Sequence, residues 1–149
     1  MRKAILGFAA VVVSLLVLAG CGDDSSTISQ EEYERQIELV CNKSLQSREE
    51  LFGQLTQEYE EIGEENVTAK YEEENLRKLY AQYEETTEEI DEIGLPEGNE
   101  EKAEELVRER EEAAAKVQAS PLGTRDSLST IFEKPGKLAE SLGAEGCGS

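Results

Sequence analysis

Apolar residues recur every three or four positions through long stretches of this chain that are otherwise rich in Glu, Lys, Arg and Gln. This spacing places them on one face of an α-helix, and the residues between them are good helix formers. The main Gly and Pro breaks lie near 63, 94–96, 120–123 and 143. No segment alternates apolar and polar residues in the manner of a half-buried strand, so the sequence predicts an all-α domain.

The first helix is predicted to begin at a capping box, in which the Ser29 hydroxyl and the Glu32 carboxylate satisfy free backbone N–H groups. Gly63 is expected to end it. Apolar residues at helical spacing are expected to face the core along the whole helix: Tyr33, Ile37, Val40, Cys41, Leu45, Leu51, Phe52, Leu55, Tyr59 and Ile62.

Three further helical parts are expected after Gly63. The second helix covers about 66–93 and the third about 99–119, and the C-terminal part begins at Asp126 and restarts at Pro135. Short connections favour antiparallel neighbours. The expected fold is therefore an all-α, antiparallel bundle of three long helices plus a broken C-terminal helix, closed by one disulfide.

The start of the chain has the form of an export signal. Arg2 and Lys3 precede an apolar run over 4–18, which is shorter than the roughly 20 residues that span a bilayer. Leu18-Ala19-Gly20-Cys21 then forms a lipobox. This leader resembles that of bacterial lipoproteins, and the resemblance implies a diacylglyceryl group on the Cys21 sulfur and cleavage before Cys21. An ordinary signal peptide with a coincidental LAGC sequence is the alternative.

The leader divides the chain into three segments: a signal peptide over 1–20, the acylated Cys21 with a flexible tether over 21–28, and an acidic helical domain over 29–149. Loss of the leader, which contains Arg2 and Lys3 and no acid, takes the formal charge from −19 to −21. Nucleic-acid phosphates and anionic lipid headgroups repel such a surface. The expected location is a cell membrane, through the lipid on Cys21, with the domain facing the extracytoplasmic side; the sequence leaves inner or outer membrane open.

Two cysteines remain once Cys21 carries lipid. Cys41 lies on the inward face of the first helix and Cys147 in a Gly-rich tail, so an oxidising compartment favours a disulfide between them. Two free thiols, or a bridge to another protein, are the alternatives. The chain has no Cys-x-x-Cys motif that would indicate a redox role. The paired cysteines and the closing segment 142–148 resemble small extracytoplasmic lipoproteins, which supports the helical fold only.

No catalytic constellation stands out in the sequence. The chain contains no His, which excludes Ser-His-Asp and Cys-His catalysis and His-based zinc sites, and it has no phosphate-binding Gly-rich loop. Acidic runs such as 84–92 lack the turn of a calcium loop and are expected to form a solvated face. The protein is therefore predicted not to be an enzyme, with no catalytic residue, metal site or cofactor.

Two kinds of function fit these features. The first is a membrane-anchored, non-catalytic protein-interaction module, whose acidic faces meet a basic extracytoplasmic protein or peptide. The alternative is a small-molecule or lipid-binding lipoprotein, with the ligand held between helices around Tyr71, Leu79, Tyr83 and Phe132. A structural or cation-buffering role in the envelope is a third hypothesis. Ordinary core packing is the expected role of the tyrosines themselves.

Overall fold

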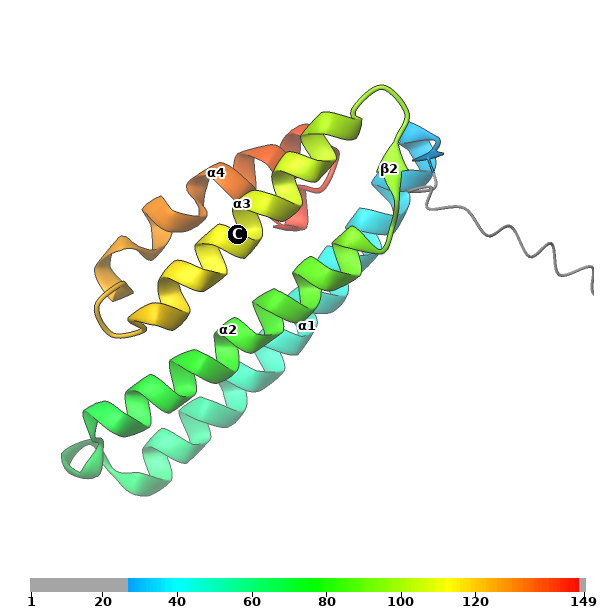
Figure 1. Ribbon diagram of the computed structural model, residues 1–149. Coiled ribbons are helices and arrows are strands. Elements are labelled where there is room, and N and C mark those ends of the chain that lie inside the picture. Colours follow the sequence, from blue (N-terminus) through cyan, green and yellow to red (C-terminus); the bar gives the residue numbers. More distant parts are fainter. Residues whose placement is uncertain (1–26, 148–149) are drawn as a thin grey trace, which may run out of the picture.

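Four α-helices pack into one bundle in the computed structural model, which describes residues 27–147. They are α1 (Gln30–Ile62), α2 (Ala69–Asp91), α3 (Glu100–Ala119) and α4 (Leu128–Ser141). Short 3-10 turns lie between or after them: η1 (Glu64–Asn66), η2 (Arg125–Ser127) and η3 (Glu145–Cys147). Figure 1 shows α1 beside α2, and α3 beside α4. The predicted all-α bundle is confirmed.

The ends of α1 follow the predicted Ser29 cap and Gly63 stop, but the Glu32 carboxylate, expected to complete a capping box, accepts from the side chains of Arg35 and Gln36 instead. The backbone N–H of Glu32 donates to the Ser29 hydroxyl at 3.3 Å, and Gly63 ends the helix with a φ of 79°. α2 begins at Ala69, later than expected, because residues 64–66 take the η1 turn first. Thr68 caps α2 by accepting from the backbone N–H of Tyr71 at 3.2 Å.

A short parallel strand pair closes one end of the bundle. β1 (Thr27–Ile28) pairs with β2 (Leu95–Pro96), and the backbone N–H of Glu97 donates to the Ile28 carbonyl at 2.8 Å. Residues 27 and 28, which were expected in the flexible tether, are thus paired with β2, and these two short strands accompany a fold that is otherwise helical. A two-residue strand cannot show alternation, and its pairing depends on tertiary proximity rather than on local pattern.

The C-terminal helical part is interrupted earlier than expected. The irregular turn is η2, and α4 then continues without a break through Pro135. A proline inside a helix removes one hydrogen bond and costs about 3 kcal/mol. Pro135 and Gly136 are both buried, so packing of α4 against the bundle offsets that cost.

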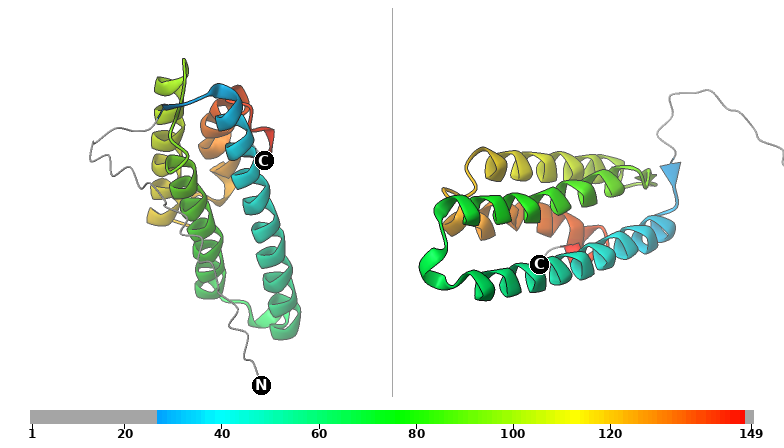
Figure 2. Two further views of the ribbon diagram at one scale, coloured as in Figure 1. Left: turned by 90° about the vertical axis from the view of Figure 1, so that its right-hand side faces the viewer. Right: turned by 90° about the horizontal axis from the view of Figure 1, so that it is seen from below.

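The apolar core lies at the end of the bundle that carries the strand pair. Its buried residues come from α1, the end of α2, the start of α3 and the chain around the end of α4: Tyr33, Ile37, Cys41, Ile90, Ile93, Ala103, Leu106, Ala139, Leu142 and Ala144. At the other end α1 and α2 extend beyond α3 and α4 (Figures 1 and 2). The bundle is therefore closed at one end and two-helical at the other.

The projecting end corrects the predicted apolar stripe of α1. Phe52, Tyr59 and Ile62 were expected to face the core, but they are 65%, 40% and 38% exposed. At 1.5 Å per residue α1 is about 50 Å long, whereas α3 is about 30 Å and α4 about 21 Å. The shorter helices therefore leave this part of the stripe incompletely covered: Leu55 is buried, whereas Phe52, Tyr59 and Ile62 stay exposed.

A disulfide joins Cys41 on α1 to Cys147 in η3, as expected from the sequence. The two Cα atoms are 5.1 Å apart and the residues are 106 positions apart in the chain. η3 packs against both α1 and α4, so the bridge holds the end of the chain between them.

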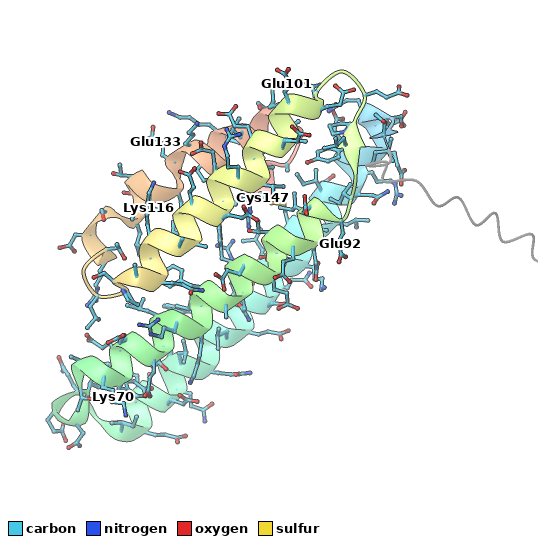
Figure 3. The ribbon with its side chains drawn as sticks, in the orientation of Figure 1. Lys70, Glu92, Glu101, Lys116, Glu133 and Cys147 are labelled. Atoms are coloured by element: carbon cyan, nitrogen blue, oxygen red, sulfur yellow. A yellow bond between two sulfur atoms is a disulfide. The ribbon has the colours of Figure 1, made fainter. Side chains whose placement is uncertain are left out.

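In Figure 3 the labelled charged side chains of Lys70, Glu101 and Glu133 point outward from the helices that carry them.

Candidate functional site

A cavity of about 280 Å³ lies in the middle of the bundle, beside the apolar core. All four helices and η3 contribute to its wall. The lining is mostly apolar, with two arginines and four hydroxyl-bearing side chains: Cys41, Ser44, Arg48, Leu76, Leu79, Tyr80, Tyr83, Thr86, Arg110, Leu128, Phe132, Gly136, Gly146 and Cys147. A mostly apolar lining with a few polar groups is typical of small-molecule sites, and the volume lies just below their usual range of about 300 to 1,000 Å³.

Arg110 is the unexpected residue of this wall. It lies on α3 at helical spacing from Leu106, Ala113 and Val117, so its side chain points to the buried face of that helix. Its exposure is 2%, comparable to that of its apolar neighbours. The sequence did not single out Arg110, although its position within the apolar stripe of α3 was the available signal.

The Arg110 guanidinium is held by α2. Its Nε donates to the Thr87 hydroxyl at 3.0 Å, and that hydroxyl in turn donates to the Tyr83 carbonyl oxygen at 2.8 Å. Nη2 lies 3.5 Å from the same carbonyl oxygen, and the central carbon lies 3.9 Å from the centre of the Tyr83 ring. A cation stacked in this way on an aromatic face gains a favourable electrostatic contact. The guanidinium is thus fixed in place at the cavity wall.

The charge of Arg110 has no acidic partner in the described part of the chain. Every ion pair found among residues 27–147 involves another base, and no carboxylate oxygen lies within 4.0 Å of the Arg110 guanidinium. Burial lowers the pKa of Arg110. The charge of the nearby Arg48 lowers this pKa further, whereas the Tyr83 side chain raises it. A guanidinium nevertheless stays protonated in proteins. The cavity wall therefore carries a buried positive charge, in a chain that is strongly acidic overall.

Tyr83 adds a second unsatisfied group at the same place. Its hydroxyl is buried and has no hydrogen-bond partner among the described residues. Burial raises the pKa of Tyr83, although the charges of Arg110 and Arg48 act in the opposite direction. The phenol is therefore neutral at physiological pH and does not balance the Arg110 charge.

Aromatic rings form the wall next to these polar groups. The rings of Tyr83 and Phe132 are 4.7 Å apart and tilted by 57°, and those of Tyr80 and Phe132 are 6.3 Å apart and nearly parallel. Such pairs are favourable beyond the area that they bury. On the opposite side Thr86 Oγ1 lies 2.8 Å from Ser44 Oγ and 2.7 Å from a backbone carbonyl oxygen, which ties α2 to α1.

The structure brings together three of the four residues that the sequence analysis proposed around a ligand. Leu79, Tyr83 and Phe132 line the central cavity, whereas Tyr71 does not. Tyr71 lines a second groove, of about 320 Å³, on the projecting end of the bundle. That groove is formed by α1, α2 and the connection between α3 and α4, with Phe52, Leu55, Tyr59, Leu76, Leu79 and Leu122 among its apolar residues.

The remaining expectations concern the leader and the acidic runs. Cys21, the proposed lipidation site, and the signal peptide lie outside the described residues. No helix within residues 27–147 combines the length and apolar character needed to cross a membrane. Nor does this range contain a group of three or more His, Cys, Asp or Glu side chains placed to hold a metal ion.

Comparison with known proteins gives no relative for this chain. No protein-family model matches it, and neither a curated protein sequence nor a solved structure is significantly similar to it. The chemistry of the cavity is therefore the basis for assigning a function.

Proposed function

We propose that this protein is a lipid-anchored, extracytoplasmic binding protein, without catalytic activity, whose small ligand occupies the central cavity. The observation that carries this proposal is the buried Arg110 in the wall of a cavity of about 280 Å³. Of the two functions considered from the sequence, this geometry favours the small-molecule alternative over the protein-interaction module.

Both features reduce the stability of the unliganded fold. A buried charge without an acidic partner destabilises the folded state, because the loss of its hydration is not compensated by an ion pair. A cavity adds a further cost, because the atoms that line it lack packing partners. Two such costs at one place are typical of a site maintained for function rather than for stability.

The proposed anchor fits a role close to a membrane. The segment 21–26 between the lipidated cysteine and β1 reaches at most about 20 Å when fully extended. The rise along α1 from Gln30 to Ser44, which lines the cavity, adds about 21 Å. The ligand would then be held within a few tens of ångströms of the membrane surface.

Mass spectrometry of the native protein tests this function. A small molecule is expected to copurify with the full chain when it is isolated from its own membranes, in about one copy per protein. Ser44→Phe, which fills part of the cavity, should remove it. Ser129→Phe places the same side chain on an exposed position of α4 and serves as the control. Retention of the molecule by Ser44→Phe, or its absence from the wild type, would contradict the proposal.

A protein-interaction role remains the second candidate, and a separate observation supports it. Phe52 and Tyr59 are exposed at the projecting end, next to the second groove. Exposed carboxylates surround them on α1 and η1: Glu58, Glu60, Glu61, Glu64 and Glu65. An amphipathic segment with a basic face and an apolar face matches this surface.

Capture of proteins from the cell envelope at two salt concentrations tests the second candidate. Retention of a basic partner is expected to fall at high salt and in Phe52→Ser, whereas Leu39→Ser, another exposed apolar residue of α1, should have no effect. A set of partners that is indifferent to ionic strength would exclude an electrostatic role.

A further inference from the structure

We propose that the ligand of the central cavity is a small monoanion, a carboxylate attached to an apolar body about the size of one ring and a short chain, and that its carboxylate pairs with Arg110. This inference rests on the proposed function and specifies its ligand class.

The sign and number of charges follow from the residues of the wall. Arg110 is 2% exposed and has no carboxylate within 4.0 Å among the described residues, and the Tyr83 phenol beside it is neutral. Arg110 is thus a fully buried positive charge without a counter-charge within residues 27–147, whereas Arg48, the other arginine of the wall, is only half-buried. A ligand with a single negative charge balances the Arg110 charge, a neutral ligand leaves it unbalanced, and a cation would be repelled.

The guanidinium offers a suitable edge for a carboxylate. Nε is occupied by the Thr87 hydroxyl, the ring of Tyr83 covers one face, and Nη2 makes only a long contact of 3.5 Å. Nη1 has no acceptor within the described residues. The edge formed by Nη1 and Nη2 matches the two oxygens of a carboxylate, and this paired geometry is the strongest that arginine forms with such a group.

The size and lining of the cavity define the rest of the ligand. At roughly 30 Å³ per atom, 280 Å³ holds about ten non-hydrogen atoms. Leu79, Leu128 and Phe132 present apolar surface to it, and the neighbouring rings of Tyr80 and Tyr83 provide faces for stacking. A flat or short-chain apolar body fits this wall, whereas a sugar or another densely hydroxylated molecule would leave most of its polar groups without partners.

The acidic exterior of the domain suppresses the binding of anions outside the cavity. A mature domain with a formal charge of −21 repels small anions from its outer surface. Anion binding at the surface is therefore weak, and a measured preference for an anion over its neutral isostere reports on the cavity.

Calorimetric titration with two probes of equal size tests the proposal. The probes are 3-phenylpropionate and its uncharged amide, 3-phenylpropionamide, applied to the full chain with its disulfide intact. The carboxylate is expected to bind the wild type about 10- to 100-fold more tightly than the amide, because the charge-assisted pair forms only with the anion. In Arg110→Met this preference should disappear, while the amide keeps its affinity.

A further variant separates the possible outcomes. Arg110→Lys retains the charge without the paired geometry, so it should bind the carboxylate more tightly than the amide by a smaller factor than the wild type does. This variant replaces Arg110→Met in the test if Arg110→Met does not fold. Equal affinity for the two probes, tighter binding of the amide, or no binding of either overturns the ligand class. The copurification experiment with Ser44→Phe reports separately on whether the cavity binds any molecule.

Discussion

Removing the disulfide between Cys41 and Cys147 should cost this protein a large share of its stability. The bridge closes a loop of 106 positions. The chain-entropy model gives about 4.8 kcal/mol for a loop of this length at 25 °C, because the cross-link restricts the unfolded chain. Residues Leu142 and Ala144 are fully buried beside the bridge and hold part of the tail without it. We therefore expect a loss of about 3 to 5 kcal/mol, against a total of about 5 to 15 for a typical domain.

Urea unfolding followed by circular dichroism measures this loss. The double variant Cys41→Ala/Cys147→Ala should unfold at a lower urea concentration than the wild type, and wild type with reductant should behave like the variant. Cys21→Ser leaves the bridge intact and is the control, with an unchanged midpoint. The slope of the transition should increase in the double variant, since an uncrosslinked unfolded chain exposes more surface. A loss below about 1 kcal/mol would refute the argument from loop closure.

Three further predictions concern single residues. Tyr33→Phe should raise the free energy of unfolding at neutral pH by about 1 kcal/mol in urea titrations, because the buried Tyr33 hydroxyl has no hydrogen-bond partner among the described residues. Burial also raises the pKa of Tyr33 from 10.0 to about 12, so the folded state favours the neutral phenol. The stability linked to this raised pKa is fully present below pH 10 and is lost as the pH rises toward 12. Over that range the free energy of unfolding should fall more steeply for the wild type than for Tyr33→Phe. Equal slopes for the two proteins would contradict this assignment. Gly143→Ala should lower the thermal midpoint, since Gly143 has a φ of 89° and an added Cβ would lie 2.7 Å from Glu34 Cγ. Gly53→Ala, in an open helical position of α1, should instead raise stability by about 0.5 to 1 kcal/mol. A higher thermal midpoint for Gly143→Ala than for Gly53→Ala would contradict both assignments.

Much of the secondary structure could be predicted from local chemistry. The Ser29 cap and the Gly63 stop of α1 were predicted from residue type and spacing alone, and both are confirmed. Such signals act within one or two turns of a helix, because a capping side chain satisfies a backbone group only a few positions away. The Cys41–Cys147 pair was likewise inferred from the number of cysteines available and the face on which Cys41 lies.

The candidate site could be predicted only in part. Leu79, Tyr83 and Phe132 were grouped correctly, because aromatic and aliphatic residues at helical spacing are expected between helices. Arg110 was missed, since a single arginine in a chain rich in charged residues is normally solvated. Its burial depends on Thr87 and the Tyr83 ring, which lie on a different helix. Contacts of that kind are not encoded in the spacing of one segment.

The sequence by itself determined where α1 begins and ends, which face of a helix is apolar, and which two sulfurs pair. Tertiary structure alone decided how far each apolar face is covered. Periodicity gives the direction of a side chain around its own helix axis, but its burial depends on whether another helix extends alongside it at that level. On α1, Phe52 is 65% exposed although Leu55, one turn further along, is buried, and Arg110 on α3 is buried against Thr87 and the Tyr83 ring of α2.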